Sequence, residues 1–579
     1  MGTFIRLVDF DTKEKEIEFF NTDNYYLFDI RDNNRVPSSP VVYQASEKML
    51  QIFEAGNLLG GLAVVRNGMK TGENERFIRL WWEVSDEKSY YHASTCNEAI
   101  ASGKKWFPYN KGGSARRWYG NNDYVVDWEN GGAVVIGKAK EDGRHVQDYP
   151  DDMKFEDSVT WSLINTKAPT FRLKSGSISD IAGMSFYRAG ENTLYLLSLC
   201  NSVISTELLQ MIAPTMNYQA GDIARIPVCI DESRREQIEG LAKRCVEISK
   251  EEWDSNEISW DFEKHPLVID TDTIQNAVSI FKEKCLNVNN EIAELEDKLD
   301  TIFLDIYGFN RKGFGEDKFV RSKLYQEDEE DLIKSLISYA VGCVMGRYSL
   351  KDGGIAYAGG VWDEQKYTDS FKPCEYGVLP ITEEQFFEED LCTRVIDFVQ
   401  VVYGERTLNE NLKFIASILK PGSYDAPKKI IRDYLFNEFF DYHYQVYQHR
   451  PIYWQLDSGK AGGFKAIVYI HRYDENTLPL VRTEFIQDLR YKYEEEMQRQ
   501  KGRLEGAATT AEKNSIKKDI AALDKRIVEC AAYDELLNHA SSNIRNYLFD
   551  TDEGVKKNYL KFLSMDGDKS KNMLTVVKI

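Results

Sequence analysis

Residues 278–306 read VSIFKEKCLNVNNEIAELEDKLDTIFLDI, and this stretch carries the most regular apolar pattern in the chain. Apolar side chains recur there at alternating spacings of three and four, at Val278, Phe281, Cys285, Val288, Ile292, Leu295, Leu299, Ile302 and Ile306. This spacing is typical of one face of a long α-helix. We therefore predict a helix of about 35 residues, about 50 Å long, with Asp270 or Thr271 as its N-cap.

Two interpretations of this helix remain open. Its apolar stripe packs on its own domain, or the helix is a rigid spacer that holds two modules at a fixed distance. The sequence before it is strand-rich and aromatic, and the sequence after it is mainly helical. We predict an N-terminal strand and connector (1–44), a mixed α/β (α+β) domain (45–232), a linker (233–269), the spacer helix (270–310), a mixed helical domain (311–420) and a C-terminal domain (421–579).

The two ends of the chain carry weaker signals. Residues 3–10 (TFIRLVDF) form a short β-rich run, and we expect its partner strands in an upstream domain that this sequence does not contain. After the long helix, we predict an acidic helix start at 326–331, helices at 332–345 and 391–403, and a strand hairpin within 430–473. Two further helices, 485–504 and 511–537, are broken at 506–510 and predict an antiparallel helical hairpin at 485–538, with Ile516, Ile520, Leu523 and Ile527 in its core.

Composition indicates a soluble globular chain with no membrane span. The 579 residues are 42% hydrophobic and 29% charged, and no apolar run reaches the roughly 20 residues that a membrane helix needs. The nine cysteines include no CxxC pair, so we expect neither disulfides nor a zinc ribbon, and we expect the cytoplasm as location. The net charge of −21 disfavours a free-standing DNA-binding protein, but phosphate binding depends on local positive potential rather than on the whole-chain sum.

Several motifs of self-contained enzymes are absent from the sequence. It has no Asn-Pro-Pro or Asp-Pro-Pro loop and no GxGxxG after a strand, which an amino-methyltransferase needs to orient the base and to hold S-adenosylmethionine. It has no Walker loop, HExxH or GxSxG either, and its seven histidines show no metal spacing. We therefore predict no catalytic residue, no metal and no cofactor in this chain.

A glycine-bounded turn, GMKTG at 68–72, precedes ENERF at 73–77. The glycines permit a tight turn and close approach to a backbone such as that of DNA. Four side chains in it are candidate DNA contacts: Lys70, Thr71, Asn74 and Arg76. An ordinary hairpin explains the same spacing equally well, and the following Trp81 and Trp82 are expected in the core rather than stacked on bases.

The densest basic and aromatic segment is KKWFPYNKGGSARRWY at 104–119, with five basic residues and five aromatics. Lys and Arg can contact phosphates or guanine edges, Asn can read adenine, and aromatic rings can stack on an extruded base. A solvated basic turn over an aromatic core is the alternative. The candidate DNA contacts here are Lys104, Lys105, Asn110, Lys111, Arg116, Arg117 and Asn121.

Taken together, the ordered blocks of the chain resemble the BREX phage-defence adenine-specific DNA methyltransferase family (PglX) and, more loosely, the type IIG restriction-modification enzymes. The blocks are 68–72 with Asn74 and Phe77, 104–113, 117–121, 160–163, 214–219 with 221–222, 306–308, 338–343, 346–349, 448–454, 463–466, 471–474, and 552–556 with 558–559. They cover nearly the whole chain from residue 3 onward. Residues 563–579 depart from the family's usual short terminus.

The resemblance implies a layout and a function. A complete member would place a catalytic domain before a target-recognition domain and a helical C-terminal region, and would transfer a methyl group from S-adenosylmethionine to adenine N6. This chain matches only the later part, so the resemblance implies that 45–232 recognises double-stranded DNA. It implies that methyl transfer needs a catalytic methyltransferase half or another subunit of the defence system. Two alternatives remain open: an interaction scaffold of a defence complex, and a truncated non-catalytic gene copy.

Overall fold

The computed structural model describes residues 1–579 except 8–9, 38, 44, 56, 144–148, 163–168, 214–216, 315–318, 320, 327 and 564–571. Parts of five predicted segments therefore lie outside the described residues: positions 8–9 of the 3–10 run, the end of the 160–163 block, the start of the 214–219 block, position 327 of the acidic helix start and about half of the divergent terminus. Contacts divide the chain into two compact units. Unit 1 holds 1–78, 90–253 and 286–325, and unit 2 holds 79–89, 254–285 and 326–579. The predicted domain limits stay predictions.

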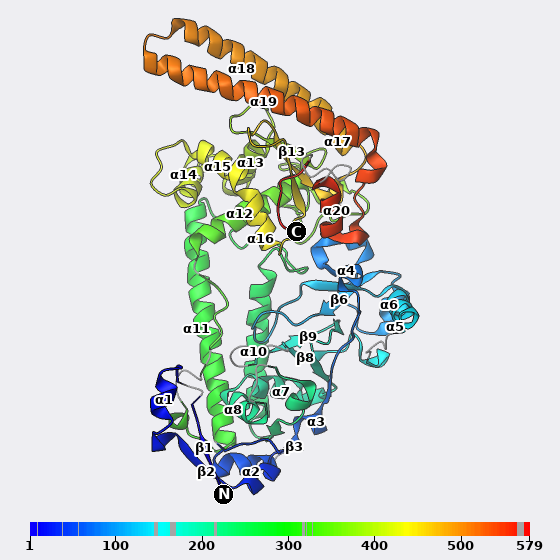
Figure 1. The fold of residues 1–579 in the computed structure, drawn as a ribbon, viewed down its shortest axis with the longest axis vertical. Helices are drawn as coiled ribbons and strands as arrows, with labels where there is room; N and C mark the ends of the chain where they lie inside the picture. Colours follow the sequence, from blue (N-terminus) through cyan, green and yellow to red (C-terminus); the bar gives the residue numbers. More distant parts are fainter. Residues whose placement is uncertain are drawn as a thin grey trace. The chain divides into compact units, whose positions relative to one another are not determined.

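Unit 1 is built from short strands with helices around them (Figure 1). Its sheets have the orders β1-β2, β10-β6-β7-β5, β4-β11-β8-β9 and β12-β3. The strands are β1 (Gly2–Ile5), β2 (Tyr25–Phe28), β3 (Asn57–Leu58), β4 (Val64–Arg66), β5 (Ile78–Leu80, of which only Ile78 is assigned to unit 1), β6 (Trp106–Asn110), β7 (Tyr124–Asp127), β8 (Ser158–Trp161), β9 (Phe171–Lys174), β10 (Ile178–Ser179), β11 (Ser185–Tyr187) and β12 (Pro227–Val228). The predicted N-terminal strand exists as β1, and it pairs antiparallel with β2, later in the same chain. The expected pairing with an upstream domain stays a prediction.

The helices of unit 1 pack around two apolar clusters. They include α2 (Glu47–Ala55), α4 (Asn74–Phe77), α5 (Cys96–Ala101), α6 (Glu129–Glu141), α7 (Thr193–Cys200), α8 (Val203–Ile212) and α10 (Arg235–Asp254). Trp118, Trp161 and Phe171 share the first cluster with residues of α7, α8 and α10. A second cluster gathers Phe107, Val126 and other residues of β6 and β7.

The long periodic helix is confirmed as α11 (Ile274–Ile306). Six residues of the predicted stripe are buried, and Phe281, Val288 and Ile306 are half-buried. The predicted cap is wrong: the side chain of Thr273 accepts a hydrogen bond from the backbone N–H of Asn276 at 3.2 Å, so Thr273 occupies the N-cap. The first part of α11 belongs to unit 2 and the rest, from residue 286, to unit 1.

Unit 2 is mainly helical, as predicted. It contains α12 (Glu329–Met345), α13 (Leu391–Tyr403), α14 (Leu408–Leu419), α15 (Pro427–Asn437), α16 (Phe439–Val446), α17 (Thr477–Leu480), the π-helical segment Val481–Ile486 and α20 (Gly554–Leu563). The strand hairpin is confirmed as β14 (Tyr453–Asp457) and β15 (Lys465–Tyr469), which β13 (Val378–Ile381) extends to the order β13-β15-β14. Trp81 and Trp82 are only 2% and 1% exposed, so the prediction that they belong to the core is confirmed.

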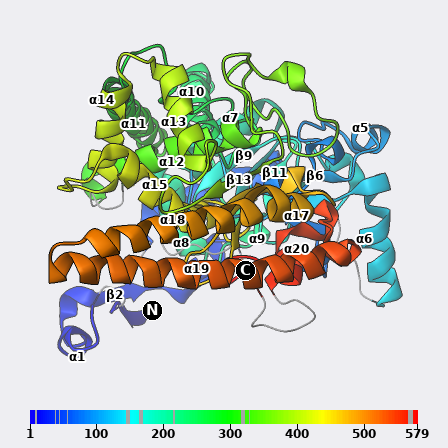
Figure 2. The ribbon, with the colours of Figure 1, turned by 90° about the horizontal axis from the view of Figure 1, so that it is seen from above.

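The helical hairpin is also confirmed, as α18 (Gln487–Gly506) and α19 (Thr510–Ser542) (Figure 2). Ile516 and Leu523 are buried, and Ile520 and Ile527 are half-buried, as the stripe predicts.

All nine cysteines are free thiols, in line with the expected absence of disulfides. Within the described residues no single helix is long and apolar enough to cross a membrane. The bent pair Gly190–Cys200 and Val203–Ile212 passes that test together, and most of its side chains are buried in the core of unit 1.

Candidate nucleic-acid interface

Three short parallel segments of unit 1 end at the same edge of a sheet: the segment at Met69, β6 and β10. The end of β6 pairs in parallel with β10, and Met69 forms a parallel bridge to Asp180, just after β10. The Tyr109 hydroxyl lies 3.1 Å from the Met69 carbonyl oxygen and 2.7 Å from Asp180 Oδ2, so it can donate to either. Because parallel strands share their carboxyl ends, the loops that begin at residues 70, 111 and 181 leave from the same edge, the usual place for binding loops in such sheets. This edge brings the two predicted DNA-contact segments together.

Glycines allow these segments to approach one another. A Cβ atom at Gly68 would stand 2.1 Å from the carbonyl oxygen of Ser179, and one at Gly183 would stand 2.1 Å from that of Asn110. Gly112 has φ +83°, a conformation that favours glycine. The backbone that Gly68 approaches is therefore one inside unit 1, which gives this glycine a structural role.

Residues 116–122 are held on β9 by a single parallel bridge at Trp118 and by side chains of the strand. The backbone N–H of Trp118 donates to the Phe171 carbonyl oxygen, and the N–H of Leu173 donates to the Trp118 carbonyl oxygen. Two buried cations of β9 bind the same loop: Arg172 donates to the carbonyl oxygen of Arg116 at 3.1 Å, and Lys174 to that of Asn121 at 2.9 Å. Burial lowers the pKa of Arg172 to about 10 and holds the pKa of Lys174 well below its usual range.

Both arginines of the segment have acidic partners. Arg116 forms an ion pair with Glu252 of α10, and its Nε donates to the Tyr119 carbonyl oxygen at 2.7 Å. Arg117 is 8% exposed in its side chain and lies 3.5 Å from Glu296 of α11. The Trp118 indole N–H donates to the same carboxylate at 2.7 Å. These pairs fix the loop to two helices.

Three of the polar side chains predicted to contact DNA form hydrogen bonds within the protein. Asn110, 1% exposed, donates to Thr160 Oγ1 at 2.7 Å and to the Gly183 carbonyl oxygen at 3.0 Å. Asn121 is 6% exposed and donates to the Ser114 carbonyl oxygen at 2.9 Å. Thr71, 4% exposed, donates to Asn74 Oδ1 at 2.7 Å. For these residues and for the two arginines, the structure shows structural contacts, and their contact with DNA stays a prediction.

The other predicted contacts reach the surface. Lys70, Asn74 and Arg76 are exposed, and Lys104, Lys105 and Lys111 are half-buried. Arg76 lies 3.5 Å from Glu73, and Lys105 lies 3.8 Å from Asp127. The ammonium group of Lys111 lies over the ring of Tyr124, 5.2 Å from its centroid. Lys70 and Lys111 each begin a loop at the shared edge, so they are the candidates best placed to meet a phosphate.

Sequence reasoning missed Arg172, Lys174, Glu252 and Glu296. Arg172 and Lys174 alternate with apolar residues in FRLK, a pattern that predicts a strand with one polar face. The two acids lie on charged helices, where a carboxylate is ordinarily solvated. No local signal therefore pairs them with a loop more than a hundred positions earlier.

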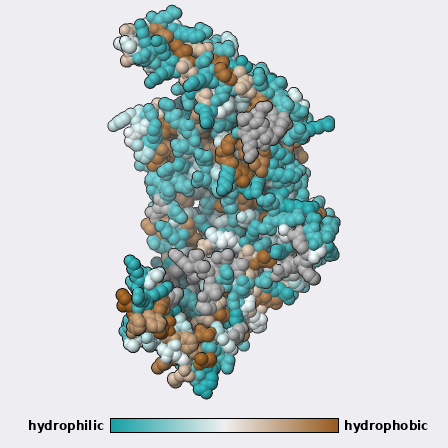
Figure 3. All heavy atoms as spheres, in the orientation of Figure 1, coloured by the Kyte–Doolittle hydropathy of each residue, from teal (hydrophilic) through white to brown (hydrophobic). Residues whose placement is uncertain are grey.

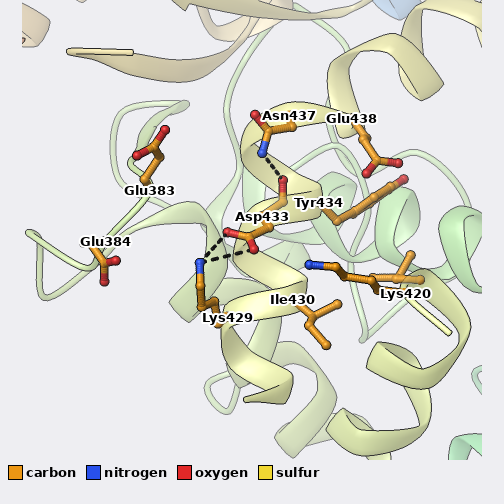
Figure 4. A pocket seen from close by; sticks show the side chains of 10 residues that line it. Glu383, Glu384, Lys420, Lys429, Ile430, Asp433, Tyr434, Asn437 and Glu438 are labelled. Atoms are coloured by element: carbon orange, nitrogen blue, oxygen red, sulfur yellow. Dashed lines mark hydrogen bonds and ion pairs between the residues drawn. The ribbon is translucent and has the colours of Figure 1, made fainter. Parts of the chain in front are cut away.

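A pocket of about 450 Å³ opens in unit 2, and none of the predicted site residues lines it (Figure 4). Its charged lining comes from α15, from Glu438 between α15 and α16, and from the segments after β13 and α14: Glu383, Glu384, Lys420, Lys429, Asp433 and Glu438. Lys429 pairs with Asp433 one helical turn away, at 3.2 Å. Within the described part of the chain, no group of three or more His, Cys, Asp or Glu residues could hold a metal ion.

Two adenine-specific methyltransferases are similar to almost the whole chain, while no family model matches it. PglX of Lacticaseibacillus casei (strain Zhang) is 35% identical over 583 residues, which cover 97% of this chain and 48% of that protein. BrxX of Escherichia coli O9:H4 (strain HS) is 31% identical over 593 residues, which cover 96% of this chain and 47% of that protein. The chain spans about half the length of these curated relatives. The predicted resemblance to PglX is confirmed, whereas the assignment to the half without the catalytic domain stays a prediction. The chain is related, along almost its whole length, to about half of the adenine-specific methyltransferases PglX and BrxX.

Proposed function

We propose that this chain supplies the DNA-recognition part of an adenine-N6 DNA methyltransferase of the BREX type, and that the groups that transfer the methyl group lie outside this sequence. The similarity to about half of two adenine-specific methyltransferases carries the proposal. The sequence lacks an Asn-Pro-Pro motif and a glycine loop for S-adenosylmethionine, which supports the division of labour.

The loop edge of unit 1 is the proposed DNA contact. Lys70 and Lys111 follow parallel segments that end together, and loops in that position are free to vary in sequence without disturbing the sheet. Long flexible ammonium side chains suit phosphate contacts, which position a protein on the duplex. Asn74 and Arg76 on α4 follow the first of these loops and are exposed, so they are the proposed base-reading side chains.

A methylation assay tests the division of labour. The purified chain is incubated with S-adenosylmethionine, labelled on the methyl group, and duplex DNA. We expect no label in adenine from the chain alone, and label in adenine when the chain is co-expressed with the part of PglX that it does not match. Methyl transfer by the chain alone would overturn the division.

Charge reversal tests the proposed DNA contact. We expect the double variant Lys70→Glu, Lys111→Glu to lower the dependence of log K on log salt by about 2, since each phosphate contact contributes about 0.9. The matched control is Lys243→Glu, Lys323→Glu, which changes the charge equally at two exposed lysines of unit 1 outside these loops. Equal binding of both variants would contradict the contact.

A scaffold role is the second candidate, and one observation favours it. Arg116 and Arg117 already pair with Glu252 and Glu296, so the strongest basic segment is partly neutralised within unit 1. Under this alternative, unit 1 keeps its fold for a protein partner and the loop variants leave protection of cellular DNA unchanged. Loss of protection in the Lys70→Glu, Lys111→Glu variant would exclude it.

A further inference from the structure

The turn end of the helical hairpin is a strongly basic surface in an acidic chain. Residues 497–518 contain two acidic residues and six basic ones, whereas the chain as a whole carries a net charge of −21. We call the six the hairpin-tip cluster: Arg499, Lys501, Arg503, Lys513, Lys517 and Lys518. All six are exposed. Positions equally distant from the turn lie opposite each other in an antiparallel hairpin, which brings Arg503 near Lys513 and Arg499 near Lys517.

Among the described residues, the hydrogen bonds and ion pairs that join the hairpin to other elements of unit 2 lie near its base. The Tyr493 hydroxyl donates to the Gly463 carbonyl oxygen at 2.8 Å, and Arg526 forms an ion pair with Glu383. From Tyr493 to the end of α18 the helix continues for about 20 Å at 1.5 Å per residue. Figures 1 and 2 show α18 and α19 side by side, with their turn at the end away from α17.

Most charges of the tip do not serve helix stability, although Arg499 pairs with Glu496 one turn earlier at 3.0 Å. Elsewhere on the helices of unit 2, basic residues pair with acids one turn away, as in Lys334 with Glu330 and Lys492 with Asp488. In the hairpin-tip cluster, Lys513 and Lys517 stand four residues apart, where like charges weaken a helix by a few tenths of a kcal/mol. Among the described residues, Lys501, Lys513, Lys517 and Lys518 take part in no salt bridge. Such an arrangement indicates a binding surface.

The surface suits nucleic acid better than protein. Protein interfaces have an apolar or aromatic centre and few lysines. In the fully described stretch 494–526 no large hydrophobic side chain is exposed, and the nearest are Tyr491 and Val528. Figure 3 shows the hairpin, at the top of that view, as largely hydrophilic. A hairpin that exposes flexible Lys and Arg side chains, and no large hydrophobic side chain, matches the uniform negative charge of a duplex.

We propose that the hairpin-tip cluster binds the phosphate backbone of duplex DNA, without reading its sequence. The proposal rests on the proposed function, because it adds a second, sequence-independent contact to the loop edge of unit 1. The tip would lengthen the protein's footprint on DNA beyond the bases that the loops read.

The test compares two variants of the full chain on one fluorescent duplex between 50 and 200 mM salt. The first variant is Arg503→Gln, Lys513→Gln, Lys517→Gln, Lys518→Gln, which removes four charges and keeps good helix formers. We expect the slope of log K against log salt to fall by about 3 to 4. The control is Lys513→Arg, Lys517→Arg, Lys518→Arg, which keeps the charge and should bind like the original chain. Circular dichroism verifies equal helix content.

The outcomes distinguish the hairpin-tip contact from the DNA contact of the unit 1 loops. If the glutamine variant shows an unchanged slope of log K against log salt, the hairpin tip does not contact DNA. The partner of the hairpin-tip cluster is then an acidic protein surface. If the Lys70→Glu, Lys111→Glu variant still loses binding in that case, the proposed function survives. A reduced slope in the glutamine variant alone supports the tip contact and contradicts the role of the loops.

Discussion

Replacing Glu296 with alanine should destabilise unit 1 by about 3–5 kcal/mol, the cost of removing one partner of a buried ion pair. The carboxylate is 3% exposed and accepts hydrogen bonds from the Trp118 indole at 2.7 Å and from the Ser322 backbone N–H at 2.7 Å. It also neutralises Arg117, 3.5 Å away. Without it, Arg117 loses this carboxylate, and the buried Trp118 indole N–H and the part-buried Ser322 N–H lose their acceptor. Each unsatisfied buried donor costs about 1–3 kcal/mol.

Urea unfolding followed by tryptophan fluorescence measures the effect. With a typical dependence of about 1–3 kcal/mol per M, the loss corresponds to a midpoint lower by at least about 1 M. The matched control is Glu294→Ala on the same helix. Glu294 is 73% exposed and pairs with Lys298 at 3.9 Å, so its loss should cost under about 0.5 kcal/mol. A Glu296→Ala midpoint equal to that of the control would refute the anchoring of the loop on α11.

Four further predictions follow from single sites. Glu257→Gln should stabilise unit 2 increasingly as pH rises from 4.5 to 7. Burial raises the pKa of Glu257 to about 7, so in this range the unfolded state ionises while the folded state keeps its proton, and the original chain loses stability. Urea midpoints as a function of pH measure this, and a pH-independent gain would contradict it. Stability should fall by about 1.4 kcal/mol per pH unit below 6.5 through His265, whose pKa burial lowers to about 3, and His265→Gln should flatten that slope. Gly120→Ala should destabilise unit 1 by about 1–3 kcal/mol, since φ is +118° and the methyl group would meet a guanidinium, and thermal unfolding shows whether it does. Lys70→Ala should weaken duplex binding equally for every DNA sequence, and a change of sequence preference in a binding-site selection would contradict a phosphate contact.

Local periodicity explains which elements the sequence predicts well. The three-and-four spacing of 278–306 gives α11 because every stripe residue faces the same side of a helix. The hairpin of α18 and α19 follows from the Gly-Ala-Ala-Thr-Thr break and the stripe around Leu523. The sequence does not fix the cap of α11, because Asp270, Thr271 and Thr273 all suit an N-cap. In the structure the hydrogen bond from the Asn276 N–H to the Thr273 side chain identifies Thr273.

The candidate site is harder to predict because its partners are distant in sequence. Arg116 meets a carboxylate 136 positions later, and Trp118 one 178 positions later. A basic segment looks the same in sequence whether its cations face solvent or buried acids. The parallel pairing that joins the loops at residues 70 and 111 depends on β10, a strand of two residues that carries no periodic signal.

The most direct test of the central claim is the affinity of the purified chain for duplex DNA as a function of salt. If unit 1 and the hairpin tip contact phosphates, log K falls linearly with log salt, and binding at 50 mM weakens by at least about 100-fold at 200 mM. Absence of duplex binding at 50 mM salt, by a chain whose helix content matches the structure, would contradict the claim.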